Sequence, residues 1–153
     1  MINKVIISDA SCLIALDRIH QLEILHQLFS FVFTTKEIEI EFGNPLPKWI
    51  TIQPLKNIEK KTELLKIVDE GEASAIALAL ETDNCILIID GKKGRKLAQK
   101  LNIEIAGTLQ ILLLAKSKGF ISSLTKIFSE LEQESFRFSP NLKEEILRKA
   151  NEL

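Results

Sequence analysis

Two short apolar runs, each stopped by an aspartate, constrain the fold of this chain more than any other feature. Val5–Ser8 and Cys85–Ile89 are continuous and rich in β-branched residues, the pattern of strands buried on both faces of a sheet. Asp9 follows the first run directly, and Asp90 follows the second. Segments with helical periodicity lie between such runs. The sequence therefore predicts an α/β fold in which helices cover both faces of a central parallel sheet.

Amphipathic helices and shorter strands are expected over the rest of the chain. Ser11 offers an N-cap for a helix after the first aspartate, Thr108 for a later one, and Gly71 is expected to separate two helices. The other expected strands are 31–33, 49–52 and 103–105, and the expected helices are 11–16, 21–29, 35–42, 61–68, 72–81, 95–101, 108–116, 122–133 and 140–151. Either Thr34 or Thr35 is expected to cap the third of these helices. Because no linker or repeat interrupts this pattern, we expect residues 1–153 to form a single domain.

Composition and residue spacing exclude several classes of function. The net charge is −1, so any grip on nucleic acid must be local rather than a property of the whole surface. Cys12 and Cys85 lie in apolar runs and are expected in the core, without zinc spacing or a disulfide framework. His20 and His26 have the pattern of surface histidines, and the glycines form neither a P-loop nor a dinucleotide fingerprint. With no signal peptide and no run near the ~20 apolar residues of a membrane span, we expect a cytoplasmic protein that does not contact membranes.

Acidic residues are the strongest candidates for a functional site. In open parallel sheets, ligands bind beyond the carboxyl ends of the strands, so Asp9 and Asp90 are expected in one crevice. Either aspartate alone is equally explained as a cap of the following helix or turn. Glu41, on a helix among apolar neighbours, and Glu72, in the first turn of another helix, strengthen the cluster hypothesis. Glu72 alone is also explained as a partner of the helix dipole.

A divalent cation would resolve the repulsion within such a cluster. Carboxylates that are brought together raise the pKa of the last one to ionise. Magnesium accepts oxygen ligands, usually one or two carboxylates with waters and phosphate, and can activate water for hydrolysis. The segment 91–96, Gly-Lys-Lys-Gly-Arg-Lys, follows Asp90 directly and suits phosphate contacts. A solvated helix face explains most of these lysines equally well, and Arg95 is the best candidate because it lies close to the strand end.

Five segments, taken in order along the chain, resemble the motifs of PIN-domain proteins. They are residues 8–16 (SDASCLIAL), 35–42 ending in Glu41, 71–79 (GEASAIALA), 88–98 (IIDGKKGRKLA) and 107–119 (GTLQILLLAKSKG). The resemblance implies a PIN-like fold and a ribonuclease that hydrolyses RNA phosphodiester bonds with Mg²⁺ or Mn²⁺. Matched position by position, it implies the catalytic acids Asp9, Glu41, Glu72 and Asp90, with Asp9, Glu72 and Asp90 as metal ligands. The expected substrate contacts are Ser11, Lys92, Arg95 and Thr108.

The resemblance also implies partners, and one residue departs from the family pattern. Many relatives are toxins of VapBC-type toxin–antitoxin pairs, inhibited by a small antitoxin protein and often homodimeric. The fourth motif usually carries two adjacent aspartates, and here the second is Gly91. If that aspartate is a metal ligand in relatives, this chain binds metal more weakly or has lost cleavage. The alternative function is therefore a PIN-fold module that binds RNA or a protein partner. A third reading, a receiver-like domain phosphorylated in an acidic pocket, gives Glu72 no role.

Overall fold

The central sheet of this protein is entirely parallel, with the strand order β3-β2-β1-β4-β5. The computed structural model describes residues 2–153. The strands are β1 (Ile2–Ser8), β2 (Phe29–Thr34), β3 (Ile50–Ile52), β4 (Cys85–Ile88) and β5 (Ile105–Ala106). The two runs that stop at aspartates thus form neighbouring central strands, paired with Ser8 opposite Ile88. The predicted parallel sheet is confirmed.

The strand order also decides between α/β topologies. Receiver-like domains use the order 2-1-3-4-5, whereas this sheet has the order 3-2-1-4-5. The receiver-like hypothesis is therefore wrong. In the observed order the chain changes direction across the sheet between β1 and β4, and this switch point is where open α/β sheets bind ligands. Asp9 and Asp90 lie directly beyond it.

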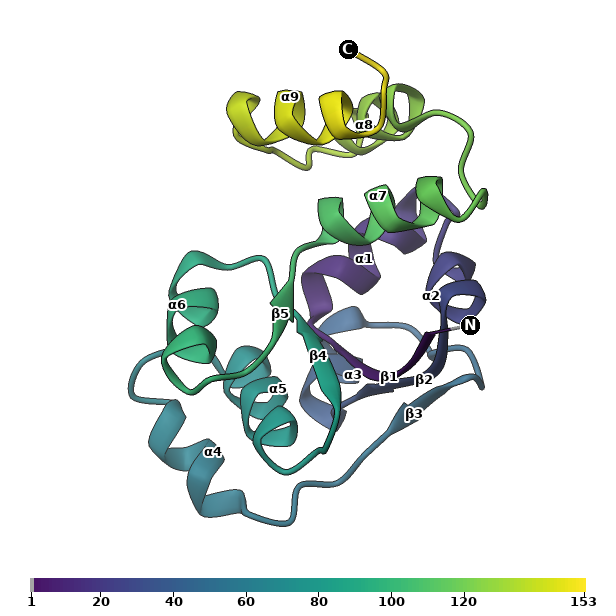
Figure 1. Cartoon of the computed structure of the whole chain (residues 1–153). Coiled ribbons are helices and arrows are strands. Elements are labelled where there is room, and N and C mark those ends of the chain that lie inside the picture. Colours follow the sequence, from purple (N-terminus) through teal and green to yellow (C-terminus); the bar gives the residue numbers. More distant parts are fainter. Residues whose placement is uncertain (1) are drawn as a thin grey trace.

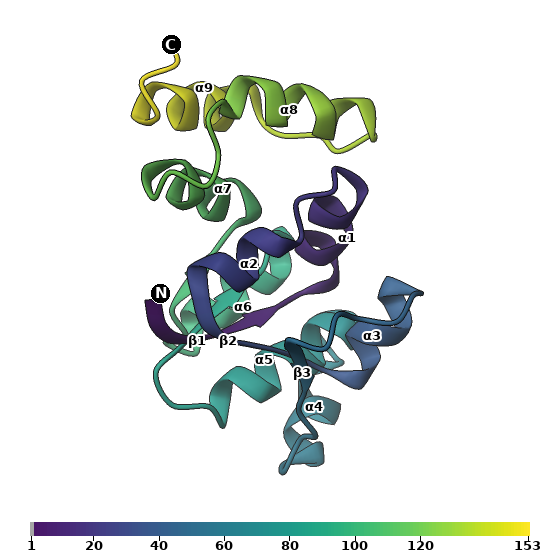
Figure 2. The same cartoon turned by 90° about the vertical axis from the view of Figure 1, so that its right-hand side faces the viewer.

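Helices cover both faces of the sheet. They are α1 (Ala10–Arg18), α2 (Glu23–Leu28), α3 (Lys36–Phe42), α4 (Ile58–Leu64), α5 (Glu70–Leu80), α6 (Lys92–Lys100), α7 (Thr108–Ser117), α8 (Leu124–Gln133) and α9 (Pro140–Lys149). Helices α1, α2 and α7 lie on one side and α4 and α5 on the other (Figures 1 and 2). Helices α8 and α9 form an outer layer on α7. Within residues 2–153, no helix combines the length and apolar character needed to cross a membrane.

The core explains why the two predicted strands are central. Ile6 and Ile7 of β1 and Leu87 and Ile88 of β4 have no exposed surface. Burying each such side chain contributes roughly 1.5–3 kcal/mol, which favours pairing these two strands in the middle of the sheet. Of the two cysteines expected in the core, Cys12 is fully buried, but Cys85 is only partly buried.

Several predicted helix starts are wrong, and the cause is the same in two cases. Helix α1 begins at Ala10 with Asp9 as its N-cap, not at Ser11. Helix α5 begins at Glu70 with Asp69 as its N-cap, so Gly71 lies inside this helix and does not separate two helices. In both, an aspartate in extended conformation accepts the backbone N–H of the third helical residue, Cys12 or Glu72, and starts the helix earlier. Thr108 is not an N-cap either: Gly107 precedes α7 in that role.

Other boundaries differ by a few residues. Helix α4 covers 58–64 rather than 61–68, α6 begins at 92 rather than 95, and the last strand is 105–106 rather than 103–105. Helix α2 ends at Leu28 because Phe29 already belongs to β2. Helix α3 agrees with the prediction: Thr35 caps its first turn, and Gly43, with φ +84°, follows its last residue.

Candidate active site

Asp9 and Asp90 meet at the carboxyl ends of the two central strands. The Asp9 N–H continues the sheet by donating to the Ile88 carbonyl at 3.0 Å. The Asp90 N–H donates to the Asp9 Oδ2 at 3.1 Å. The backbone of one aspartate thus holds the side chain of the other. The structure brings this predicted pair together at the topological switch point.

Asp9 is both a helix cap and a buried acid. Its Oδ1 accepts the Cys12 N–H at 2.9 Å, which confirms the capping hypothesis for this residue. Only 5% of its surface is exposed. Burial first, and then the negative charge of Asp90, raise the pKa of Asp9 to about 7, although its two backbone hydrogen bonds act in the opposite direction. Capping accounts for the hydrogen bonds but not for placing a second carboxylate beside a buried first one.

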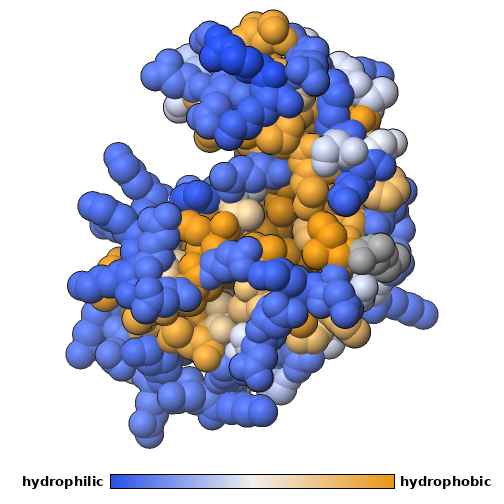
Figure 3. Space-filling view, viewed as in Figure 1, coloured by the Kyte–Doolittle hydropathy of each residue, from blue (hydrophilic) through white to orange (hydrophobic). Residues whose placement is uncertain are grey.

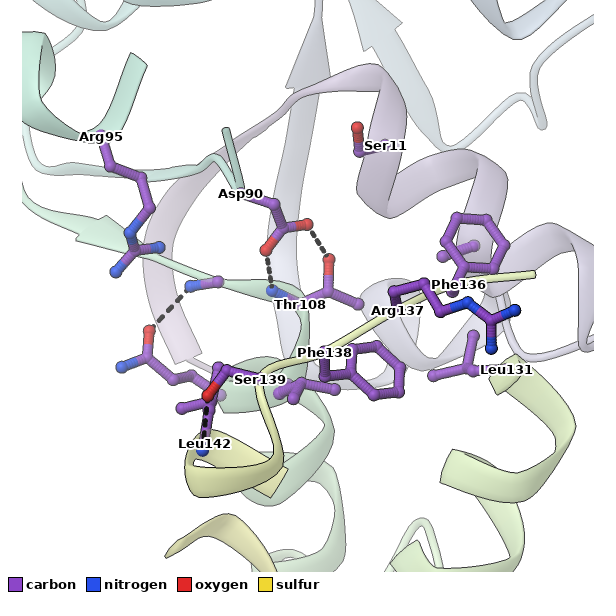
Figure 4. Close-up of a pocket in the computed structure, with 14 residues that line it drawn as sticks. Ser11, Asp90, Arg95, Thr108, Leu131, Phe136, Arg137, Phe138, Ser139 and Leu142 are labelled. Carbon is purple, nitrogen blue, oxygen red and sulfur yellow. Dashed lines mark hydrogen bonds between the residues drawn. The ribbon is translucent and has the colours of Figure 1, made fainter. Parts of the chain in front are cut away.

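Asp90 does not cap the helix that follows it. Gly91 is the N-cap of α6, without a side-chain hydrogen bond. The Asp90 carboxylate instead accepts the Thr108 N–H at 2.9 Å and the Thr108 hydroxyl at 2.5 Å, at the start of α7 (Figure 4). Arg95 lies nearby, because its Nη1 donates to the Ile89 carbonyl at 2.8 Å. Thr108, predicted as a substrate contact, uses its hydroxyl to orient an acid.

The Glu72 carboxylate lies against the loop that follows Asp90. A Cβ atom at Gly91 would collide with Glu72 Oε2, and one at Gly94 would lie 2.7 Å from the same oxygen. Gly91 therefore permits this position of Glu72. Burial and the neighbouring charge of Asp69 raise the pKa of Glu72.

Glu41 reaches the same region from α3. The Thr35 hydroxyl is 2.7 Å from the Ser74 hydroxyl, which ties the start of α3 to α5. A Cβ at Gly71 would lie only 2.6 Å from Glu41 Oε1, so the absence of a side chain there lets Glu41 approach the first turn of α5. Burial and Asp69 raise the pKa of Glu41.

Asp69 is the acid that the sequence analysis missed. It is exposed, caps α5 by accepting the Glu72 N–H at 2.9 Å, and acts electrostatically on both Glu41 and Glu72. A signal was present: an aspartate followed three residues later by a glutamate marks a helix N-terminus. Asp9 interacts with Glu72 as well as with Asp90. We use the name acid row for the five residues Glu41, Asp69, Glu72, Asp9 and Asp90.

The donor chemistry of the acid row fits a hard divalent cation. Its members offer only carboxylate oxygens, the ligands that Mg²⁺ prefers. Among residues 2–153, no group of three or more His, Cys, Asp and Glu side chains has the arrangement of a metal site. Mg²⁺ is commonly held by one or two carboxylates with waters and phosphate, and the pair of Asp9 and Asp90 matches that number of protein ligands. Each of their oxygens accepts one hydrogen bond and retains a second lone pair.

A pocket of about 420 Å³ opens beside Asp90. The predicted contacts Ser11, Arg95 and Thr108 line it, together with Asp90 (Figure 4). Lys92 is exposed at the start of α6 and is not part of the lining. The opposite wall comes from residues 136–139, between α8 and α9, and from Leu142 of α9. The sequence analysis assigned no role to this segment, although its Phe-Arg-Phe run combines two aromatic residues with a cation.

The whole chain was compared with known proteins. A family model described as a PIN domain matches residues 5–152. The comparisons with curated proteins and with solved structures found no match. The match covers every member of the acid row and the pocket beside it.

Proposed function

We propose that this chain, which belongs to the PIN-domain family, is a metal-dependent endoribonuclease that hydrolyses RNA phosphodiester bonds. PIN domains are commonly nucleases. The observation that carries the proposal is the junction of Asp9 and Asp90 beyond the two central strands, with Glu72 beside them. A buried carboxylate with a raised pKa, such as Asp9, in the crevice beyond a topological switch point is a candidate for a functional site.

The proposed cofactor is Mg²⁺ or Mn²⁺, held by Asp9 and Asp90 and approached by Glu72. When bound, such an ion supplies an activated water and neutralises charge that develops on the phosphate. The chain itself fixes the ligands: the Cys12 and Asp90 N–H groups orient Asp9, and Thr108 orients Asp90. Glu41 and Asp69 extend the negative potential of this site along the rest of the acid row.

Positive side chains beside the acid row are the proposed contacts for RNA phosphates. Arg95 lies closest, since it is hydrogen-bonded to the carbonyl that precedes Asp90, and Lys92 is exposed one turn earlier. Ser11 faces the pocket from α1 and offers a hydroxyl to the substrate. Thr108 is proposed as a positioning residue for Asp90 because its hydroxyl is already donated.

A narrower proposal makes this ribonuclease the toxin of a VapBC-type pair, with a small antitoxin protein as inhibitor and a homodimer as the active form. Its support is the resemblance of the five motifs. Expression of the chain should arrest growth, and co-expression of a small protein encoded by an adjacent gene should restore it. If cells grow normally while they strongly express a chain that cleaves RNA in vitro, the toxin role is excluded and the ribonuclease proposal stands.

The alternative function, a PIN-fold module that binds without cutting, rests on Gly91. Gly91→Asp restores the second aspartate of the family motif, and Gly91→Ala is its control, because both must displace the Glu72 carboxylate. A parent chain that is inactive in both metals, with an active Gly91→Asp variant, would establish the alternative. An active parent removes it.

The direct test is Asp9→Asn against Asp17→Asn, two aspartates at opposite ends of α1. With a labelled single-stranded RNA and Mn²⁺, we expect Asp9→Asn to abolish cleavage while its circular dichroism spectrum is retained, and Asp17→Asn to cleave like the parent. Saturating Mn²⁺ should also stabilise the parent by ~2.7 kcal/mol at a hundredfold excess over its Kd. Equal cleavage by the parent and Asp9→Asn would disprove the proposed site.

A further inference from the structure

The pocket beside Asp90 lies between the edge of the sheet and the C-terminal layer. Figure 3 shows a hollow between the α8–α9 layer and the body of the molecule, with hydrophobic residues visible in it. Its outer wall is the connection between α8 and α9, which faces Ser11 of α1 and Asp90, residues far from it in the sequence. With about 420 Å³, the pocket has room for one planar heterocycle and part of a sugar.

Two aromatic rings of this wall have packing partners within the chain. The Arg18 guanidinium lies 5.7 Å from the centre of the Phe136 ring. The Phe138 ring packs 5.7 Å from Phe128, which is fully buried. Leu142, 39% exposed, leaves apolar surface open to the pocket. The apolar wall is therefore already formed and does not depend on a ligand.

Cationic side chains flank the acid on either side. In the view of Figure 4, Arg95 and Arg137 lie on opposite sides of the hydrogen-bonded pair of Asp90 and Thr108. Arg137 is exposed and projects from the same segment as the two phenylalanines. The pocket is therefore lined by two aromatic rings, two cationic side chains and Asp90 of the acid row.

We propose that this pocket receives one nucleobase of a single-stranded RNA, next to the phosphate that lies at Asp9 and Asp90. Proteins recognise unpaired bases by stacking them on aromatic rings or guanidinium planes and by binding the adjoining phosphates with arginine. The proposal rests on the proposed function, because it takes the acid row as the place of the scissile phosphate. An apolar peptide would fill the volume but would leave both arginines without an anionic partner.

The test separates base insertion from backbone contact. Affinities are measured by fluorescence anisotropy at low salt, with Ca²⁺ in place of Mn²⁺ and on RNA checked to remain intact. The ligands are a labelled octauridylate, an octaadenylate and a fully abasic ribose-phosphate octamer. Leu142→Trp fills the pocket, and Leu80→Trp, at a leucine 40% exposed at the end of α5, is its control. Arg137→Ala removes the cation, and Arg148→Ala, on the exposed face of α9, is its control.

We expect Leu142→Trp to weaken binding of the base-bearing octamers about tenfold, the worth of one stacked base, while the abasic octamer binds as before. Arg137→Ala should weaken all three RNAs, and both controls should bind like the parent. Equal affinity of parent and Leu142→Trp for the base-bearing RNAs would overturn the proposal. So would an equal loss for the abasic octamer, or a parent that does not distinguish abasic from base-bearing RNA.

The cleavage assay keeps this inference apart from the proposed function. If the parent cuts RNA with Mn²⁺ but Leu142→Trp binds like the parent, the nuclease stands and the base pocket fails. If the parent never cuts, but Leu142→Trp loses base-dependent binding, the base pocket stands and the nuclease fails. Melting temperatures of all variants must lie near that of the parent; if Leu142→Trp unfolds, Phe136→Leu, which removes one ring of the pocket wall, replaces it with the same expected direction.

Discussion

Carboxylates in two regions of this molecule have surroundings that shift their pKa values in opposite directions. Near the C-terminus, Glu152 accepts hydrogen bonds from the Lys116 ammonium and from the backbone N–H groups of Leu124 and Thr125. Burial opposes ionisation there, but these donors outweigh it and lower the pKa of Glu152 to about 2. At the carboxyl edge of the sheet, burial and a neighbouring acid raise the pKa of Asp9 to about 7.

The opposite pKa shifts of Glu152 and Asp9 distinguish a carboxylate that the chain neutralises from a group of carboxylates that it does not neutralise. Glu152 joins α7 to the start of α8 and is balanced by the chain itself. The acid row gathers five carboxylates, and Arg95, the nearest cation described above, donates to a carbonyl rather than to an acid. A concentration of like charge is costly unless something binds it. The first region is therefore structural, and the unbalanced charge of the second supports the proposed cation site.

The largest expected effect comes from removing an acid at the edge. Asp90→Asn should lower RNA cleavage by more than ~100-fold, beyond the ~10- to 100-fold typical of losing a residue that only orients a metal ligand. Initial rates with a labelled RNA at saturating Mn²⁺ measure this. The control is Asp83→Asn, because Asp83 is an exposed aspartate before the other end of β4. An equal loss of cleavage in both variants would mean that Asp90 has no specific role in cleavage.

Glu152→Gln tests the opposite region, and its effect should fall on stability alone. The neutral amide loses the ion pair with Lys116 and the charge-assisted bonds from α8. We expect a loss of ~2 kcal/mol, or roughly 4–8 °C in melting temperature, with unchanged cleavage at a temperature where the variant is folded. Urea denaturation of both proteins gives the free energy directly.

The pH dependence of Glu152→Gln has a definite sign. Because the pKa of Glu152 falls from 4.5 to about 2 on folding, the ionised group contributes its full stability above pH 4.5 and loses it as pH falls towards 2. The difference in melting temperature between parent and variant should therefore be constant near neutral pH and shrink below pH 4.5. A difference that persists undiminished at pH 2.5 would contradict the assigned role.

Thr108→Val tests whether the hydroxyl of Thr108 orients Asp90 within the acid row. Valine keeps the shape of threonine and the backbone N–H bond to Asp90 but removes the hydroxyl donor. Cleavage should fall about tenfold, as for other partners that orient metal ligands, and the Mn²⁺ affinity should fall with it. Thr62→Val, which removes a hydroxyl bond to the Ile58 carbonyl within α4, should change neither quantity. A loss of cleavage at unchanged Mn²⁺ affinity would make Thr108 a substrate contact, as the sequence suggested.

Much of the sheet and half of the site were predictable because their signals are local. The runs that end at Asp9 and Asp90 are buried on both faces, so β-branched residues and the abrupt change to a carboxylate appear together in the sequence. Parallel strands bring their carboxyl ends to one edge whatever the connections, so both aspartates were expected at that edge. That β1 and β4 are neighbours comes from the strand order in the structure.

The remainder of the site depends on contacts between distant segments. Nothing local to Thr108 indicates that its hydroxyl binds Asp90, 18 residues earlier, in preference to capping its own helix. Likewise, Gly91 stands out in sequence as a missing aspartate, whereas the structure relates it to Glu72 on another helix. The pocket wall at Phe136 and Phe138 depends on how α8 and α9 pack on α7, which helical periodicity alone does not determine.

Glu72→Gln should have the smallest effect, a small rise in melting temperature relative to Glu70→Gln. It tests the charge imbalance most directly, because the loss of an ordinary contact lowers the melting temperature. Glu72→Gln removes a carboxylate that is repelled by Asp69 and Glu41, whereas Glu70→Gln removes a neighbouring one in the same helical turn. Both lose attraction to the dipole of α5, so their difference isolates the repulsion.

In EDTA, Glu72→Gln should melt roughly 1–2 °C above Glu70→Gln, the effect of relieving about 0.5 kcal/mol of repulsion between neighbouring like charges. With saturating Mn²⁺ the order should reverse, since only Glu70→Gln keeps the full set of acids around the ion. Thermal denaturation with and without Mn²⁺ measures both orders. Were Glu72→Gln the less stable variant without metal, the acid row would be balanced by the chain in the same way as Glu152, and the distinction between the two regions would disappear.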